Sequence, residues 1–454
     1  MEKTYLRKIA EHFYTVPFET LDQSVTHQAE RAFMDYMGIS VYSVHHHCCE
    51  KVVKFFSAAG GGGSSHPFGA KAAVNGAGAG AANAARTSSL ELDDISGVNA
   101  SVHAGVYVWS AAIEAYRLHP CDAETFIRAV AFGYDVCIRF GMLSGENVRK
   151  FGLHGPGMCG GLASAATASM IEGLDLEGAL NAISITGTLL PMCPFVSFIE
   201  GADAKDLYGG WGVFQGLLAV EAVKCGLTGP AGLLEGPKGL GLFFHSERGY
   251  DVAPGEQYFI QSISFKEFSG CFAVHPAMSC VLGLQEENAI DAETVESVVV
   301  ETYPYSYALS SGACAGPMNS ASARLNLPYC VAFALREGNL QPGAFTPESM
   351  ASEAYLSLAK RITVKNHAEY GESDLGVRGC IVEVRMKDGT VFKKEVEGAR
   401  WSGGATDGQL KDKFVQLTRG ALSKAQQDEM IDCLMHLKRK GCIERIVSMA
   451  DALN

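Results

Sequence analysis

A glycine-rich segment that holds one histidine is the part of the sequence best suited to chemistry. His154 lies in the run Phe151–Gly160, which leads directly into the small-residue stretch 161–170. Because glycines permit close backbone approach, the segment predicts an imidazole held over a small anionic substrate at the start of a tightly packed helix. The glycine neighbours also predict little packing around His154, so that its replacement would leave the melting temperature nearly unchanged. A glycine-rich turn with a surface histidine is the alternative.

A second segment places carboxylates close to a histidine. Glu91, Asp93 and Asp94 lie a short distance before His103 in the chain. Carboxylates so near an imidazole suggest positioned acid and base groups. A solvated helix end with an acidic N-cap is the alternative.

Isolated cations and one more histidine occur in three other segments. Lys205, followed by Tyr208, is surrounded by glycines and alanines. It could clamp a carboxylate as a point charge, although a plain surface lysine gives the same pattern. Lys266 and His275 lie within ten residues of each other at the expected domain junction, where binding sites are favoured. Arg324 ends a polar segment that precedes an apolar run.

Two other patterns suggest cofactors but do not fit them. Gly76–Gly80 resembles a dinucleotide loop, but no apolar strand precedes it and the full glycine spacing is absent. The run His45–Cys49 is rich in metal ligands, yet adjacent residues project in different directions and cannot all converge on one ion. The chain contains no Cys-x-x-Cys pair. We therefore expect a site without a metal or another cofactor.

The composition excludes several classes of protein. The chain has 454 residues, 14 cysteines and a formal net charge of −13. An acidic balance without a Lys/Arg-rich run argues against nucleic-acid binding. No stretch reaches the roughly 18 uncharged apolar residues of a membrane span, and the N-terminus lacks a signal or transit pattern. We expect a soluble cytoplasmic protein of two domains, with its cysteines reduced.

Apolar residues at helical spacing dominate the first 260 residues. Two helices are expected between residues 5 and 44, with a break at Val16-Pro17-Phe18. Further helical patterns cover residues 105–118, 124–142, 160–173, 176–190 and 209–226.

The pattern changes near residue 262. Residues 297–303 predict a strand, and residues 380–394 predict a hairpin with an Asp-Gly turn. Helical patterns return at 327–336, 347–360, 407–418 and 424–438. The sequence therefore predicts a mainly α protein. Residues 1–262 and 403–454 would form a large all-helical domain, and residues 263–402 a smaller α+β domain.

Taken together, the order and spacing of these motifs resemble the MmgE/PrpD family along nearly the whole chain. The motifs that carry the resemblance are Leu90–Asp94, Gly133–Val136, the Gly-x-His-x-x-Gly segment at 152–157, Asp203-Ala-Lys205, Gly226–Pro230, Lys266–His275 and Lys411–Phe414. The resemblance implies that the smaller domain is a lid and that the protein is a homodimer. It also implies cofactor-independent lyase or isomerase chemistry on a small di- or tricarboxylate.

The resemblance implies roles for individual residues. In this sequence the family's active-site positions are matched by His154, Lys205, Lys266 and His275, and the histidine after its acidic motif by His103. We therefore expect the following catalytic residues: His154, His103, Lys205 and His275. Substrate binding is expected from Glu91, Asp93, Lys266, Tyr208 and Arg324. One departure lies after Asp94, where about two extra residues precede His103.

These residue types suit the removal of a proton next to a carboxylate. The developing enediolate needs cations at its oxygens and a base with a pKa near neutrality, which lysines and histidines supply. The same site could then expel hydroxide, lose carbon dioxide or return the proton to the other face. Dehydration of a 2-methylcitrate-type acid is our first expectation, with iminodisuccinate-like epimerisation and cis-aconitate-type decarboxylation as alternatives. A catalytically inactive binding or assembly relative is the alternative outside the enzymes.

Overall fold

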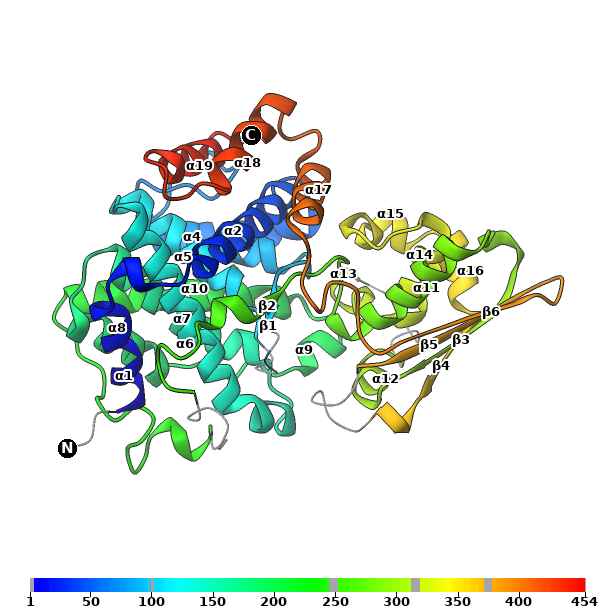
Figure 1. Cartoon of the computed structure of the whole chain (residues 1–454), viewed down its shortest axis with the longest axis horizontal. Helices are drawn as coiled ribbons and strands as arrows, with labels where there is room; N and C mark the ends of the chain where they lie inside the picture. The colour runs from blue at the N-terminus through cyan, green and yellow to red at the C-terminus, as the bar shows by residue number, and fades with distance from the viewer. Residues whose placement is uncertain are drawn as a thin grey trace.

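The computed structural model describes residues 4–96, 98, 102–244, 252–311, 319–370 and 378–453. These residues form a mainly α-helical molecule with a four-stranded sheet at one end (Figure 1). The predicted fold class, a mainly α protein with a smaller α+β part, is confirmed. Within the described residues, no helix has both the length and the apolar character needed to cross a membrane.

The break predicted at Val16-Pro17-Phe18 falls between the first two helices. Helix α1 (Tyr5–Thr15) is capped by the side chain of Thr4, and α2 (Gln23–Ser43) by that of Asp22. Between the helices the backbone is extended at Val16 and Pro17. Proline lacks the backbone N–H that would continue a helix, so the chain turns at this point.

Helix α7 (Gly155–Ile171) lies at the centre of the helical part, and every residue in it is buried. It packs against α5 (Ala104–Leu118), α6 (Ala123–Lys150), α8 (Leu176–Thr188) and α10 (Leu207–Lys224). A Cβ at Gly160 would collide with the ring of Tyr107, so only glycine allows α5 this close. The small residues of α7 thus permit the tight packing that the sequence predicts.

The Gly76–Gly80 pattern forms the start of a helix. Helix α4 (Gly76–Ser88) is capped by the side chain of Asn75 and packs against α3 (Glu50–Ala59) and α10. Its small residues allow these helices to approach closely, and the segment is therefore a packing element.

The sheet has the order β4-β3-β5-β6. Its strands are β3 (Val295–Thr302), β4 (Ile362–Asn366), β5 (Cys380–Met386) and β6 (Val391–Val396). The pair β5–β6 is the predicted hairpin, with Gly389 at a positive φ of 90° in the turn. Strand β4 runs parallel to β3 at the sheet edge and was not predicted, because its mostly exposed residues lack an apolar run.

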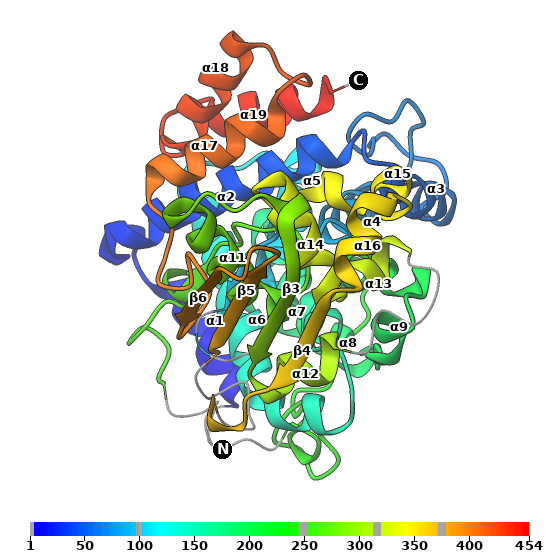
Figure 2. The same cartoon turned by 90° about the vertical axis from the view of Figure 1, so that its right-hand side faces the viewer.

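Helices cover one face of this sheet. Helix α11 (His275–Glu287) contacts β5 and β6, and α14 (Leu327–Glu337) contacts β4 and α11. Figure 2 shows the sheet in front, with these helices behind it. The helical pattern predicted at 347–360 forms two short helices, α15 (Pro347–Met350) and α16 (Glu353–Ala359). They are separated by Ala351 and Ser352, and the backbone of Ser352 is extended.

The C-terminal segment returns to the helical part. Helix α17 (Asp407–Thr418) packs along α2, followed by α18 (Lys424–Leu434) and α19 (Cys442–Asp451). One buried apolar cluster joins residues of 5–265 with residues of 405–453, and a second lies within 268–386. The two-domain division at 262 and 403 stays a prediction, which this separation supports. At the junction, β1 (Ile95–Ser96) pairs with β2 (Ile263–Ser264).

Candidate active site

A cavity lies where the helical part meets the smaller part of the molecule. It encloses about 780 Å³, its open mouth included. The helical side contributes Glu91, His103 and His154, and the other side contributes Cys271 and Arg378. An adjoining inner pocket of about 310 Å³ shares the first three residues and adds Asp93, Lys205 and Tyr208. Six of the nine predicted site residues therefore line one continuous region.

His154 is the N-cap residue of α7. Its Nδ1 accepts a hydrogen bond from the backbone N–H of Gly157 at 3.1 Å. A backbone N–H can only donate, so Nδ1 is unprotonated and the proton of the neutral ring is on Nε2. Burial lowers the pKa of His154 to about 3, and the neighbouring His103 acts in the same direction. His154 is therefore a neutral hydrogen-bond donor at physiological pH.

The expectation of little packing around His154 is wrong. The ring centroids of Phe195 and Tyr208 lie 6.0 Å and 5.4 Å from that of the imidazole. Both aromatic residues come from later parts of the chain. The glycines beside His154 describe only its sequence neighbours, so they did not predict these contacts. The capping bond adds a second structural role for this side chain.

His103 has the opposite tautomer. Its Nδ1 lies 2.6 Å from the backbone carbonyl oxygen of Asp94, which can only accept, so Nδ1 carries the proton. The lone pair is then on Nε2. The same Nδ1 lies 3.5 Å from a carboxylate oxygen of Asp93. Burial lowers the pKa of His103, and the Asp93 carboxylate opposes this shift.

Asp94, whose carbonyl orients His103, is itself fixed by hydrogen bonds to its side chain. The side chain of Asp94 accepts hydrogen bonds from the Tyr134 hydroxyl at 2.6 Å and from the Gly105 N–H at 2.9 Å. The chain between Asp94 and His103 includes residues 97 and 99–101, where the departure from the family pattern falls. These four residues lie outside the described part of the chain.

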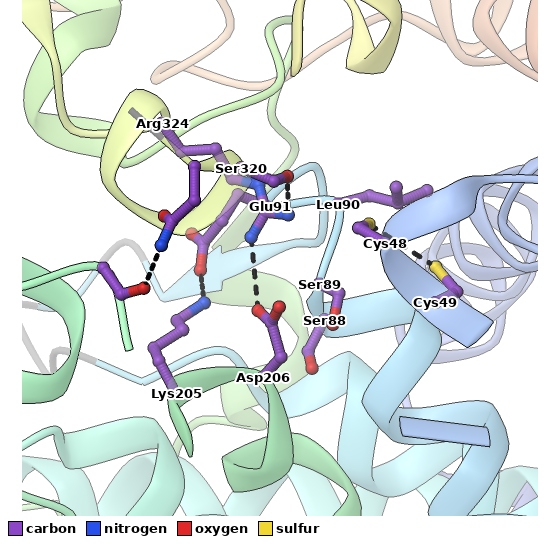
Figure 3. A network of polar contacts seen from close by, with 12 residues as sticks. Cys48, Cys49, Ser88, Ser89, Leu90, Glu91, Lys205, Asp206, Ser320 and Arg324 are labelled. Atoms are coloured by element: carbon purple, nitrogen blue, oxygen red, sulfur yellow. Dashed lines mark hydrogen bonds and ion pairs between the residues drawn. The ribbon is translucent and has the colours of Figure 1, made fainter. Parts of the chain in front are cut away.

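Two buried lysines alternate with two carboxylates beside these histidines. Lys205 donates to one carboxylate oxygen of Glu91, and the Lys266 Nζ lies 3.3 Å from the other and 3.5 Å from Asp93 Oδ1. Figure 3 shows the Lys205–Glu91 pair. Each lysine is thus held by the acidic motif, and the four formal charges cancel.

Glu91 adopts a backbone conformation that is uncommon for a residue with a side chain. Its φ is 49°, in the left-handed region, and the residue is buried. Such a conformation costs on the order of 1 kcal/mol or more and persists where surrounding contacts fix it. Here Lys205 and Lys266 hold the side chain, and the Gly270 N–H donates to the Glu91 carbonyl at 3.0 Å.

The other predicted residues lie behind the cavity wall. His275 is fully buried, with the ring centroids of Phe268 and Phe272 at 5.4 Å and 5.0 Å from its own, and its Nε2 lies 3.3 Å from the Gly270 carbonyl oxygen. Burial lowers the pKa of His275 well below its ordinary value. Arg324 is also fully buried and donates to Asp206 at 3.2 Å and to Ser320 at 2.6 Å (Figure 3). Neither side chain lines the cavity.

Two cations that the sequence analysis missed support or line the site. Lys413 of α17 donates to Asp35 at 2.6 Å, to the Leu92 carbonyl at 3.1 Å and to the Lys266 carbonyl at 2.7 Å. The motif Lys411–Phe414 contained this residue without indicating its role. Arg378 lines the cavity, with its guanidinium 5.2 Å from the ring centre of Phe272.

One cluster of metal-ligand side chains occurs among the described residues. His46, Cys48 and Cys49 place their ligand atoms within 4.8 Å of one another. The residues of the run 45–49 are not expected all to converge on one ion, but three of the five do lie together. None of them lines the cavity.

The fold and the site define a mainly α protein with paired histidines and lysine–carboxylate pairs at the junction with a smaller α+β part. Residues 7–253 match the MmgE/PrpD N-terminal domain, and residues 268–437 match the MmgE/PrpD C-terminal domain. The chain belongs to the MmgE/PrpD family, which confirms the resemblance.

One curated relative has a low sequence identity to this chain. Cis-aconitate decarboxylase of Mus musculus is 22% identical over 273 residues, which cover 58% of this chain and 54% of that protein. The chain thus spans about half the length of the curated relative that it matches.

Proposed function

We propose that the protein is a cofactor-independent lyase that removes the proton next to a carboxylate of a small di- or tricarboxylic acid. The observation that carries the proposal is the pair of opposite tautomers at His103 and His154. One ring offers a lone pair on Nε2 and the other offers an N–H, at the wall of the same cavity. Family membership and the match to a decarboxylase support a lyase.

In this proposal His103 is the general base. Its Nε2 takes the proton from the carbon, and the carboxylate of Asp93, 3.5 Å from Nδ1, stabilises the imidazolium that forms. Burial keeps the ring neutral before the reaction, because it lowers the pKa of His103. A general base in its neutral form at working pH contributes about 10²- to 10⁴-fold to the rate.

His154 stabilises the negative charge that develops on the substrate. Its Nε2–H donates to an enediolate oxygen, and the capping bond at Nδ1 keeps the ring in this tautomer. A neutral imidazole at a helix N-terminus is an effective electrophile of this kind, because the helix dipole disfavours the imidazolium. His154 is therefore assigned the donor role and not the base role.

Lys205 acts on the leaving group. Burial lowers the pKa of its ammonium to about 7, with Asp206 opposing the shift and Arg324 adding to it. An ammonium with a near-neutral pKa can protonate a departing hydroxyl, which then leaves as water. Tyr208 lines the same pocket and contacts substrate in this proposal, whereas Lys266 holds Glu91 and Asp93 from behind. His275 and Arg324 act further back, through Gly270 and Asp206.

Dehydration of a 2-methylcitrate-type 2-hydroxy acid is the first reaction proposed, and Lys205 is the group that favours it. Decarboxylation is the second, because the curated relative is a cis-aconitate decarboxylase. Epimerisation would follow if the proton returned to the other face before a group left.

The test uses a panel of 2-hydroxy and unsaturated di- and tricarboxylates in deuterium oxide. We expect the pure protein to exchange a carbon-bound hydrogen of one acid and to convert it, while His103→Gln loses both activities. His119→Gln, at an exposed histidine, is the matched control. Absence of exchange and of conversion across the panel would instead support an inactive binding or assembly relative.

We also propose that the protein is a cytoplasmic homodimer. Large apolar side chains are exposed in the stretch 189–227, where Leu189, Met192, Ile199 and Trp211 are 63%, 57%, 53% and 43% exposed. These residues are close in the chain, and exposed apolar side chains that form one patch are typical of protein interfaces. Light scattering should give twice the chain mass, and Trp211→Glu should shift it toward the monomer. A monomer at all concentrations contradicts the proposal.

A further inference from the structure

A cluster of one histidine and two cysteines lies between α2 and α3, and none of the three residues lines the candidate active site. The chain there forms a short 3-10 turn (His47–Cys49). The Cys49 N–H donates to the carbonyl oxygen of His46 at 3.0 Å, and this bond closes the turn and brings the two residues close together. Cys48 completes the cluster, with its Sγ 2.9 Å from His46 Nδ1 and 3.7 Å from Cys49 Sγ.

The spacing of the sulfur atoms suits a tetrahedral metal ion. Two thiolates bound at about 2.3 Å to one zinc ion lie ~3.8 Å apart. The observed separation of 3.7 Å between Cys48 Sγ and Cys49 Sγ is close to this value. The distance of 2.9 Å from His46 Nδ1 to Cys48 Sγ is that of a hydrogen bond, which an ion between the two atoms would replace.

The histidine is oriented as a metal ligand. His46 Nε2 lies 3.2 Å from the carbonyl oxygen of Pro342, which can only accept, so Nε2 carries the proton. Nδ1 then directs its lone pair toward Cys48. A second ring nitrogen fixed by a backbone carbonyl is the common support of histidines that bind zinc.

A metal ion could reach the cluster through a pocket that borders Cys48. His46 and Cys49 are buried, whereas Cys48 is half-buried and lines a pocket of about 1190 Å³, open solvent included. Asp206 lines the same pocket and also bonds Arg324. Figure 3 shows Cys48 and Cys49 as separate from the Lys205–Glu91 pair.

We propose that His46, Cys48 and Cys49 bind a thiophilic divalent ion, Zn²⁺, with the fourth position open to the pocket that Cys48 lines. Two thiolates and a neutral imidazole balance the charge of the ion, and each thiol releases its proton on binding. The site is independent of the proposed lyase activity, because none of the three ligands lines the active-site cavity.

The test measures metal binding to the full chain. We expect chelator-treated protein to take up one equivalent of Zn²⁺ in competition with a chromophoric chelator, and to show thiolate-to-metal absorption with Co²⁺ in its place. Cys48→Ser and Cys49→Ser should each weaken the affinity by more than about 100-fold, since even loss of an outer partner costs about 10- to 100-fold. The matched controls are His45→Ala and Cys225→Ser, both at exposed positions.

A measurement on the unaltered chain covers the case in which Cys49→Ser does not fold. Zn²⁺ should protect Cys48 from alkylation by iodoacetamide, while the exposed Cys225 stays reactive. The proposal is overturned if the wild-type chain binds no stoichiometric Zn²⁺, or if Cys48→Ser binds it with unchanged affinity.

Discussion

His103 and His154 line one cavity with opposite tautomers. Nδ1 of His103 donates to the carbonyl oxygen of Asp94 at 2.6 Å, whereas Nδ1 of His154 accepts from the N–H of Gly157 at 3.1 Å. Each partner is a backbone group with only one possible role, so both assignments follow from geometry. The rings thus differ in what their Nε2 atoms can do, and this difference separates a proposed base from a proposed donor.

Replacing His154 should separate its chemical role from its structural role. Asparagine is a good N-cap residue, so His154→Asn should keep the bond to Gly157 and lose only the packing of the ring against Phe195 and Tyr208, with a moderate fall in melting temperature. Turnover should fall by about 10²- to 10⁴-fold, because the Nε2–H donor is lost. Steady-state kinetics and thermal unfolding check both parts.

His154→Ala is the matched comparison. It removes the cap as well, so it should lose a further ~0.5–2 kcal/mol of stability without a much larger loss of turnover. Turnover of His154→Asn within a few-fold of wild type would contradict the assignment of His154 to the chemistry.

The pH dependence should report the neutral form of His103. Burial lowers the pKa of this ring below its ordinary value of 6.5, so on the acid side kcat/KM should fall only as the pH drops through the lowered pKa. On the alkaline side kcat/KM for dehydration should fall as the Lys205 ammonium, whose pKa is about 7, loses its proton. Asp93 opposes the shift, so removing its charge in Asp93→Asn should move the acid limb to lower pH. An acid limb above pH 7 in the wild type, or a move to higher pH in the variant, would be inconsistent with this role.

The buried pair of Lys205 and Glu91 should give strongly non-additive effects on stability. Lys205→Met leaves two carboxylates, Glu91 and Asp93, with Lys266 as the one cation of this group. The free energy of unfolding in urea should therefore fall by about 3 kcal/mol. Adding Glu91→Gln should restore much of this loss, because no uncompensated buried charge remains. Additive costs in the double variant would show that the pair does not interact as described.

Lys205→Met should also lower kcat, because the Lys205 ammonium protonates the proposed leaving group, and raise KM, because we expect the same cation to lie near a bound carboxylate in both the ground state and the transition state. A variant with lower kcat and unchanged KM would restrict Lys205 to the leaving group.

Chelation should separate the proposed zinc site from the chemistry. Exhaustive treatment with a chelator should remove Zn²⁺ from His46, Cys48 and Cys49 and leave turnover of the identified acid unchanged. The reason is that His103, His154 and Lys205 supply the proposed proton transfers without a metal. Loss of activity that added Zn²⁺ restores would contradict a metal-free reaction.

Much of the fold could be predicted from the sequence because its signals are local. The breaks around Val16-Pro17, the helices that became α5 to α8, and the β5–β6 hairpin all depend on periodicity, caps and turn residues within a few positions. Strand β4 was missed because its place beside β3 is set by pairing with residues more than sixty positions earlier. A local sequence pattern does not indicate which distant strand will pair with the segment.

The sequence by itself determined the family and the set of acid–base and charged residues near the site. The tertiary structure alone decided their states: the tautomers of His103 and His154, the aromatic rings around His154, and the sharing of Glu91 between Lys205 and Lys266. It also brought His46, Cys48 and Cys49 together through one 3-10 turn. The physical reason is that a proton's position and an ion pair depend on which groups meet in space, and Glu91 and Lys266 meet across 175 positions of chain.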